Sequence, residues 1–357
     1  MTNLKFYDVI KIIYDLIYLR RIKEDLFMKI RKSCNLARMY AGPQHPIDTA
    51  SPELRFMEAV CAGRIAEAIG FFCEKKLFGR EEPAVDAPYG RFSGLAGIRE
   101  FAEGFNTRFG AERSFLTPVI QTRANGRVVS ELVVNFVVDG EIEEVPMFVV
   151  GDLRTAATLD EVRLYCHFSF VPELQAYRAP IFPVGHREMG DPALLTGAVR
   201  EYYDALHHVP YVDVDRILGA MGPGCQFGGY EPWGHTANHG DRDQLRKSYE
   251  NMATYIPSKV AMRYETIIDD GRTCVIEWVH IISRRGQEDL GRIAMSGIAA
   301  YERGEDGLLC AIRISDYAGY ERTIDWSKLP LTIEEAQMVN FVETFPAGVG
   351  EKPQLSV

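Results

Sequence analysis

An internal repeat is the sequence feature that most constrains the fold. The segment Pro88-Tyr89-Gly90 recurs as Pro232-Trp233-Gly234, and Asn125-Gly126-Arg127 recurs as Asp270-Gly271-Arg272. Later strands match as well, and the separation of matched pairs stays between 144 and 150 residues. A separation held this constant over several elements indicates two tandem copies of one domain.

Each copy has a helical pattern followed by strand patterns. The expected apolar helix faces are Ile98, Phe101, Phe105 and Phe109 in the first copy and Leu245, Tyr249, Met252 and Ile256 in the second. Four long strands follow, at about 259 to 268, 272 to 283, 290 to 302 and 308 to 317 in the second copy. Helices followed by strands predict an α+β fold in which a curved antiparallel sheet packs on helices and encloses a cone.

The expected boundaries follow from the repeat. They are an N-terminal helical extension at 1–50, a first domain at 51–176, a linker at 177–193, a second domain at 194–327, and a C-terminal helix and tail at 328–357. The linker is expected there because Pro180, Pro183 and Gly185 interrupt regular structure.

The composition limits the kinds of molecule that the protein is expected to bind. The formal net charge of -10 is unlike the concentrated basic face of a nucleic-acid binder, so we expect a small hydrophobic partner and no nucleic acid. The 7 cysteines are widely spaced and include no C-x-x-C pair, which favours reduced thiols in a cytoplasmic protein.

The segment from Phe6 to Leu19 is strongly apolar but is interrupted by Asp8, Lys11 and Asp15. It is shorter than the roughly 20 residues of a membrane span, so we expect an amphipathic helix. Docking on the protein body is the favoured interpretation; adhesion to a membrane surface and a start at Met28 or Met39 are the alternatives.

The run from Ser93 to Phe101, Ser-Gly-Leu-Ala-Gly-Ile-Arg-Glu-Phe, resembles a helix start in bacterial ketosteroid isomerases. The wider group is the NTF2-like or SnoaL-like superfamily of isomerases, cyclases, dehydratases and binding proteins. The resemblance covers about residues 53 to 176 and 194 to 325. It implies two tandem cone-shaped NTF2-like domains, and it specifies the fold more firmly than the reaction.

The resemblance assigns a general base and an oxyanion donor to the second copy. Glu231 stands where the family has its carboxylate before a Pro-x-Gly turn, and Tyr202 stands where the family has a phenol. The first copy has Ala87 and Phe56 at these places, with Asp86 one residue before Ala87. We therefore expect the second domain to be active and the first to be degenerate.

The family has a second oxyanion donor, an aspartate, at a place that aligns near Ala299. This sequence has no acid there, so the resemblance does not imply a steroid Δ5-to-Δ4 isomerisation. His280 is the candidate substitute, with a hydrogen-bonded core residue as the alternative. Asp316 is a second candidate base because SnoaL-type cyclases carry an acid there, and a salt bridge with Arg313 is its alternative. The expected substrate contacts are Trp233, His235, Tyr203, Trp278, Tyr317 and Tyr89.

No metal or cofactor is expected. Gly234 and Gly240 disfavour a helix that would bring His235 and His239 together, and the sequence lacks nucleotide-binding and serine-nucleophile motifs. The expected function is a cofactor-independent isomerase or lyase that removes a proton next to the carbonyl of a steroid-, polyketide- or polyphenol-like compound. A noncatalytic binding protein and a dimerisation module are the alternatives.

The strand patterns also predict how the copies meet. Apolar residues on the strand face away from the helices indicate that the two sheets pack together as an internal pseudo-dimer, with further oligomerisation left open. We expect that face to contain Thr273, Val275, Val279 and Ile281 with Glu277, and Val128, Leu132, Val134, Phe136 and Val138 in the first copy. Cys274, Ile276 and Trp278 are expected on the inward face.

Overall fold

The structure is a computed structural model that describes residues 29–34, 36, 46–73, 82–166, 190–206, 212–229, 241–255, 259–283 and 292–316. For residues 251–255, 259–263, 279–283, 292–296 and 316 only the backbone is described. We use domain 1 for the described elements up to Cys166 and domain 2 for those from Gly190.

Domain 1 contains three helices and a seven-stranded sheet. The helices are α2 (Pro52–Cys61), α3 (Ile65–Gly70) and α4 (Gly94–Arg108). The strands are β1 (Ile30–Lys32), β2 (Ala84–Ala87), β3 (Gly90–Ser93), β4 (Arg113–Ala124), β5 (Arg127–Val138), β6 (Glu141–Leu153) and β7 (Leu159–Tyr165). The sheet order is β3-β2-β7-β6-β5-β4, and β1 pairs with β6.

Domain 2 has a similar order of elements. A 3-10 turn at Pro192–Leu194 precedes the helices α5 (Gly197–Leu206), α6 (Val214–Gly219) and α7 (Arg242–Tyr255). The strands are β8 (Met221–Gly229), β9 (Lys259–Asp269), β10 (Thr273–Ser283), β11 (Arg292–Arg303) and β12 (Leu309–Asp316), in the order β8-β12-β11-β10-β9.

The two sheets share one topology. Each has four consecutive antiparallel strands, and in each an earlier strand pairs in parallel with the last of the four: β2 with β7, and β8 with β12. The sequence predicted the four long strands of domain 2 to within two residues, but it did not predict the parallel strands. The α+β class, with two curved sheets packed on helices, is confirmed.

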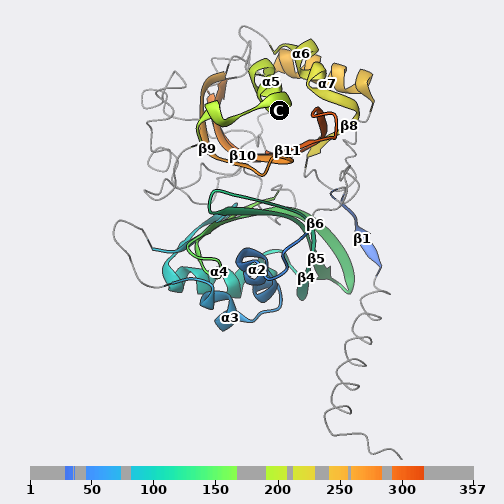
Figure 1. Ribbon diagram of the computed structural model, residues 1–357. Helices are drawn as coiled ribbons and strands as arrows, with labels where there is room; N and C mark the ends of the chain where they lie inside the picture. Colours follow the sequence, from blue (N-terminus) through green and yellow to red (C-terminus); the bar gives the residue numbers. More distant parts are fainter. Residues whose placement is uncertain are drawn as a thin grey trace, which may run out of the picture.

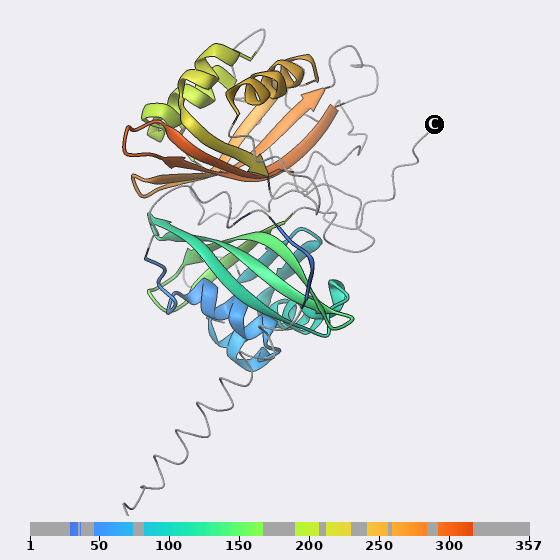
Figure 2. The ribbon, with the colours of Figure 1, turned by 90° about the vertical axis from the view of Figure 1, so that its right-hand side faces the viewer.

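The curved sheets lie back to back, and each carries its helices on the side away from the other (Figure 1). The view at right angles shows the same layering: α2, α3 and α4 lie on one outer side, and α5, α6 and α7 on the other (Figure 2). Each domain therefore has its own helix-covered interior, and the sheets form the contact between them.

The predicted helix faces are buried. Ile98, Phe101 and Phe105 are at most 1% exposed, and Phe109 is 5% exposed; Tyr249 is buried in domain 2. The side chains of Met252 and Ile256 lie outside the described residues. Pro52 begins α2 at a position where a missing backbone N–H costs no helical hydrogen bond.

An apolar cluster lies between the sheets. It contains Leu36, Val129, Val133, Phe148, Val150 and Tyr165 from domain 1 and Ile268, Val275, Ile298 and Ala300 from domain 2. Val275 lies in it as expected, and Cys274, Ile276 and Trp278 face the helices as expected. The prediction for β5 is wrong: Leu132, Val134 and Phe136 belong to the helix-packed core of domain 1.

A difference in turn length explains this error. Two residues, Asn125 and Gly126, connect β4 to β5, whereas three residues connect β9 to β10. Both Asn125 and Gly126 have positive φ, 52° and 72°, which is typical of a tight type I′ turn. Aligning the strands on these turns shifts them by one residue, and a shift of one residue exchanges the two faces of a strand.

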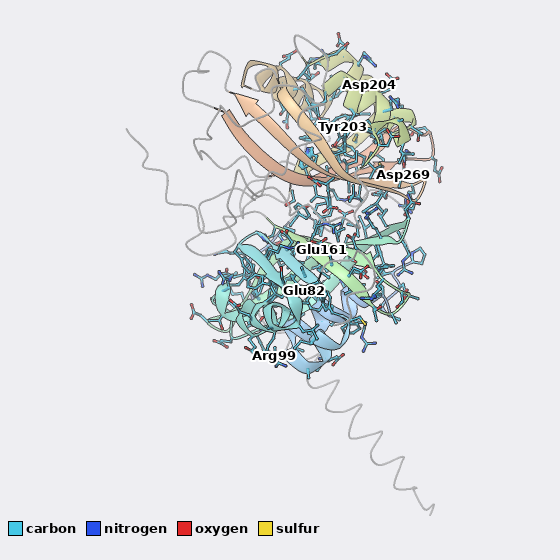
Figure 3. All side chains as sticks on the ribbon, turned by 90° about the vertical axis from the view of Figure 1, so that its left-hand side faces the viewer. Glu82, Arg99, Glu161, Tyr203, Asp204 and Asp269 are labelled. Carbon is cyan, nitrogen blue, oxygen red and sulfur yellow. The ribbon has the colours of Figure 1, made fainter. Side chains whose placement is uncertain are left out.

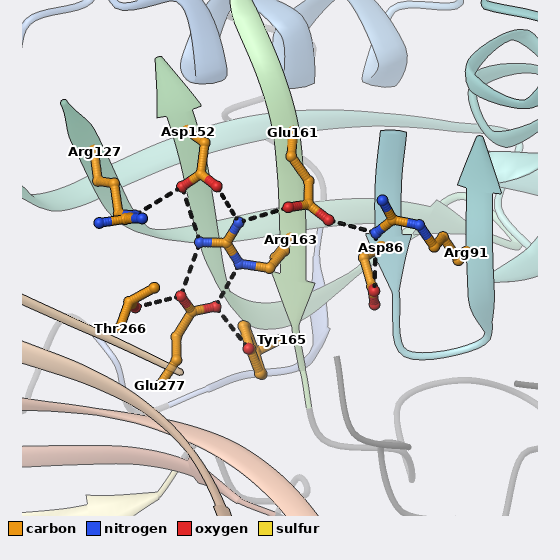
Figure 4. Close-up of polar contacts among 9 residues, drawn as sticks. All are labelled: Asp86, Arg91, Arg127, Asp152, Glu161, Arg163, Tyr165, Thr266 and Glu277. Atoms are coloured by element: carbon orange, nitrogen blue, oxygen red, sulfur yellow. Dashed lines mark hydrogen bonds and ion pairs between the residues drawn. The ribbon is translucent and has the colours of Figure 1, made fainter. Parts of the chain in front are cut away.

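Glu277 in β10 is completely buried and contacts a basic residue of the other domain. Arg163 in β7 donates to both of its carboxylate oxygens, Nε to Oε1 at 2.8 Å and Nη2 to Oε2 at 2.9 Å. The Tyr165 hydroxyl donates to Oε1 at 2.7 Å, and the Thr266 hydroxyl also donates to this carboxylate. Figure 4 shows these contacts between the sheets.

Arg163 also binds two carboxylates of its own domain. Its Nη1 lies 2.8 Å from Asp152 Oδ2 and 3.1 Å from Glu161 Oε2. Burial by itself lowers the pKa of this guanidinium, but Asp152, Glu277 and Glu161 together raise it well above its ordinary value. Arg163 is therefore a fixed positive charge between three carboxylates.

A second buried ion pair crosses the interface in the opposite direction. Arg313 in β12 donates to Glu131 in β5, Nε to Oε2 at 2.6 Å and Nη2 to Oε1 at 3.0 Å. Its Nη1 donates to Glu302 of its own domain at 2.8 Å. Bidentate pairs of this kind fix orientation as well as charge, so these two contacts set the register of one sheet on the other.

Ile30–Lys32 forms strand β1 inside the segment that the sequence assigned to a helical extension. It pairs in parallel with β6, and basic side chains on or beside it face acidic ones at the start of β6. Lys32 lies 3.1 Å from Glu143, and Lys29 lies 3.3 Å from Glu141. The amphipathic helix expected from Phe6 to Leu19 lies outside the described residues.

Candidate functional site

The interior of domain 2 contains a cluster of tyrosines. Five of them are at least 92% buried and belong to the core between α5, α7 and the sheet: Tyr202, Tyr203, Tyr249, Tyr264 and Tyr301. Tyr202 and Tyr203 come from α5, Tyr249 from α7, and the other two from β9 and β11. Figure 3 shows Tyr203 in this interior, whereas its neighbour Asp204 is exposed.

The hydroxyl groups of this cluster form two pairs. The Tyr202 and Tyr249 hydroxyl oxygens are 2.8 Å apart, and the Tyr301 hydroxyl donates to that of Tyr203 at 3.2 Å. The rings contact one another across the pairs, with centroids 5.2 Å apart for Tyr202 and Tyr301 and 5.3 Å apart for Tyr203 and Tyr301. The arrangement brings several hydroxyl groups together inside an apolar core.

Three of these phenols are held in the neutral form. Burial raises the pKa of Tyr203 and of Tyr301 well above the ordinary value of 10.0. Burial also raises the pKa of Tyr264, aided by Asp204 and opposed by Arg200. A neutral phenol can donate a hydrogen bond to a carbonyl oxygen or to the oxyanion that develops from it.

A pH dependence follows from these shifts. The folded pKa of Tyr203 and Tyr301 is raised, so their contribution to stability is present below pH 10.0 and is lost as the pH rises above it. The free energy of unfolding should fall by up to about 1.4 kcal/mol per pH unit for each group. We expect the double variant Tyr203→Phe/Tyr301→Phe to show a shallower decline in denaturant titrations between about pH 9 and 11.5. An unchanged slope would contradict the assignment.

The helix-packed apolar cluster of domain 1 is aromatic, and none of its fully buried members is a tyrosine. Phe56 and Phe101 stack with centroids 6.1 Å apart, Phe105 and Phe109 lie 5.4 Å apart, and Phe109 and Phe136 lie 4.3 Å apart. Phe56 is the residue that the expected repeat matches with Tyr202. The domain that the sequence predicted to be inactive thus contains stacked hydrocarbon rings, and it also contains a buried carboxylate, Glu53, which accepts from the Ser130 hydroxyl at 2.8 Å.

Tyr89 is the predicted substrate contact in domain 1. Its ring stacks with Phe101 at 6.3 Å, and the guanidinium carbon of Arg108 lies 4.2 Å from its centroid. Its hydroxyl is buried and has no hydrogen-bond partner among the described residues. Burial raises the pKa of this phenol, with a smaller upward effect from Cys166 and a downward one from Arg108.

The structure brings together some of the predicted site residues. Tyr202, Tyr203 and Trp278 share the domain 2 core. His280 is paired with Met295 on β11, and Asp316 with Gly297, but the side chains of both lie outside the described residues. The other predicted residues of domain 2 also lie outside them: Glu231, Trp233, His235 and Tyr317.

Three members of the tyrosine cluster were missed as site residues: Tyr249, Tyr264 and Tyr301. The sequence contains signals for the first and the last of them. Tyr249 lies on the apolar face of α7 and was predicted only as core. Tyr301 follows Ala299 by two residues, so both point to the same side of β11. The strand that lacks the acid expected of ketosteroid isomerases at Ala299 thus presents a phenol at its next inward position.

Asp86, the alternative acid in domain 1, is held in an ion pair. Its Oδ2 lies 3.5 Å from Arg91 Nη1, which also contacts Glu161. It is 5% exposed and lies within the network of Figure 4. Within the described part of the chain, no group of three or more metal-ligating side chains occurs, and no helix is long and apolar enough to cross a membrane.

Comparisons with known proteins give structural matches only. No protein-family model and no curated protein matches the sequence. An NTF2-like protein of unknown function from Cytophaga hutchinsonii is 13% identical, with a TM-score of 0.25 over 35% of this chain and 94% of its own.

Two further solved structures are similar to the same extent. A hypothetical protein with a ketosteroid isomerase-like fold from Catenulispora acidiphila, in complex with trimethylamine, is 16% identical. It covers 33% of this chain and 85% of its own, with a TM-score of 0.28. A Mycobacterium tuberculosis protein in complex with estradiol-17beta-hemisuccinate is 15% identical and covers 34% of this chain and 97% of its own, with a TM-score of 0.27.

Proposed function

We propose that domain 2 binds a hydrophobic small molecule through a carbonyl oxygen and catalyses its isomerisation or elimination without a cofactor. The buried tyrosine cluster is the observation that supports this proposal. Paired neutral phenols in an apolar core are suited to hydrogen-bond an oxygen whose negative charge increases during proton removal. Tyr202 is the proposed donor because the resemblance and the cluster both include it.

Proton removal also needs a base, and Glu231 is the proposed one. A carboxylate beside an apolar interior loses hydration, which raises its pKa toward the range useful for proton transfer. Asp316 is the second candidate. The proposed substrate class is a steroid-, polyketide- or polyphenol-like compound with a hydrogen on the carbon next to its carbonyl.

For domain 1 we propose a structural role. Its apolar cluster contains stacked phenylalanines, and its alternative acid Asp86 contacts Arg91. A carboxylate held by an arginine is stabilised in its charged form and is a weaker base. We further propose that the boundaries predicted from the repeat separate two copies of one ancestral domain.

A panel of enones and β,γ-unsaturated ketones tests this function. We expect an absorbance change that depends on the protein, and we expect Tyr202→Phe to lower the rate by about 100-fold because one oxyanion donor is lost. Tyr89→Phe removes the same hydroxyl from domain 1 and should leave the rate within a few-fold.

Binding without turnover is the alternative outcome. Ligand binding measured by fluorescence, with no absorbance change across the panel, would favour a noncatalytic binding protein. An equal loss of rate from Tyr202→Phe and Tyr89→Phe would contradict the assignment of the site to domain 2.

A further inference from the structure

Glu277 lies where the pairing of β9 with β10 is irregular. Thr266 of β9 lies opposite Glu277. The next pair of the ladder is Tyr264 with Trp278, so Glu265 is an extra residue on β9, which makes a β-bulge. A bulge leaves one residue out of the ladder and bends the strand. The side chains beside it therefore depend on further contacts for their positions.

The two residues of that next pair point into domain 2. Tyr264 and Trp278 are 8% and 6% exposed and belong to its helix-packed core. The ring centroids of Tyr264 and Tyr203 are 5.8 Å apart. The geometry of the bulge therefore determines where one member of the tyrosine cluster and one predicted substrate contact lie.

The side chain of Glu277 points the other way, into the contact between the sheets, where domain 1 holds it (Figure 4). The guanidinium of Arg163 donates to both carboxylate oxygens, and the Tyr165 hydroxyl donates to one of them. The Thr266 hydroxyl donates to the same carboxylate from the bulged strand. Charge-assisted bidentate contacts fix direction as well as distance. One carboxylate thus joins the two strands at the bulge, and domain 1 determines the position of that carboxylate.

The same combination occurs in domain 1. Strand β4 has an extra residue, Val119, opposite the step from Glu131 to Leu132. Glu131 accepts from Arg313 of domain 2, and Leu132 faces the core of domain 1. In both sheets, a glutamate beside a bulge binds an arginine of the other domain. In domain 2 the inward neighbour of that glutamate is Trp278, a predicted substrate contact.

We infer that Arg163 of domain 1 is a positioning residue for the site proposed in domain 2, because it holds Glu277 at the bulge and thereby sets the positions of Trp278 and Tyr264. The inference rests on the function proposed for domain 2 and gives domain 1 a part in forming that site. Arg163 lies between the two sheets, so it acts on the interior of domain 2 only through Glu277.

A fluorine label on tryptophan tests the positioning without any substrate. The full-length chain has 3 tryptophans, and Trp278→Phe identifies the resonance of Trp278 in protein labelled with 5-fluorotryptophan. The test variant is R163M/E277M, which removes both charges and leaves apolar side chains between the sheets. We expect it to fold and to shift the Trp278 resonance by more than its linewidth, because the two strands are no longer joined at the bulge.

The matched control is E131M/R313M, the same change at the other ion pair between the domains. It alters the contact between the sheets in the same way but acts at the bulge beside Leu132. The Trp278 resonance should therefore stay at its wild-type position. A folded R163M/E277M protein with the wild-type resonance would overturn the inference, as would an equal shift in the control.

If R163M/E277M does not fold, Arg163→Lys decides. Lysine keeps the positive charge but replaces the bidentate contact with Glu277 by a single one. We expect a smaller shift of the Trp278 resonance in a folded protein, and an unmoved resonance would overturn the inference.

Turnover gives a second readout. On a panel ketone that the wild type converts, R163M/E277M should raise KM by about 10-fold with little change in kcat, because a contact used for substrate binding is displaced. E131M/R313M should change neither. An unchanged KM beside a shifted resonance would overturn the link to the site. If the wild type converts no ketone, the proposed function fails, and the fluorine resonance still decides the role of Arg163.

Discussion

Replacing Arg163 by methionine is expected to lower the free energy of unfolding by about 3–5 kcal/mol. The reason is that the carboxylate of Glu277, which is completely buried, would lose the guanidinium that binds both of its oxygens. Asp152 and Glu161 retain Arg127 and Arg91. Denaturant titration of the full-length protein measures the change.

Two further variants test whether the unpaired carboxylate of Glu277 causes this loss of stability. Arg163→Met/Glu277→Met removes the buried carboxylate as well, so it should cost less than Arg163→Met alone. Lys29→Met breaks the exposed pair with Glu141 and should cost under about 1 kcal/mol. The single variant Glu277→Met completes the comparison. If the double variant is as unstable as Arg163→Met and Glu277→Met added together, the pairing of the two side chains contributes little to stability.

Replacing Glu231 by glutamine is expected to lower turnover by on the order of 100-fold or more, because the amide cannot accept the substrate proton. Asp86→Asn is the matched change in domain 1 and should leave turnover nearly unchanged, since Asp86 is paired with Arg91. The measurement is the rate on whichever panel ketone the wild type converts.

The pH profile adds a second readout for Glu231. If Glu231 is the base, the wild-type rate should fall at low pH as one group becomes protonated. The rate of Glu231→Gln should not show this decrease at low pH. Equal losses from Glu231→Gln and Asp86→Asn, or a larger loss from Asp86→Asn, would reject the assignment. Asp316→Asn then becomes the next variant to measure.

Much of the fold could be predicted from periodicity. The helix face that contains Phe101 and Phe105 and the limits of β10 followed from residue spacing. Strands β2 and β8 did not, because the four residues of β2 are too few and the glycine-rich β8 gives no strand periodicity. Their pairing with the last strand of each sheet depends on tertiary contacts.

The face of β5 could not be assigned from its own residues. Val128 to Val138 is apolar on both sides because one side packs on helices and the other on the second sheet. A strand buried on both faces has no polar alternation to mark its register. Matching Glu131 with Glu277, instead of matching the turns, would have given the observed faces.

The candidate site was predictable in part. Tyr202 followed from the resemblance, whereas Tyr249 and Tyr301 approach it only after α7 and β11 fold over α5. Their hydroxyls meet partners far away in the sequence, 47 residues apart for Tyr202 and Tyr249 and 98 for Tyr203 and Tyr301. No local sequence pattern predicts that these hydroxyl groups come into contact.

The ion pairs between the sheets join residues that are synthesised at different times. Glu131 binds an arginine 182 residues further along the chain, and Arg163 binds a glutamate 114 residues further along. At roughly 5–20 residues per second, a ribosome adds those residues over about 6–36 s. Throughout that interval a finished first domain holds a solvent-facing patch of valines, Phe148 and two charged groups whose counterparts in domain 2 are not yet made. The interface between the sheets can therefore form only after the second domain has been synthesised.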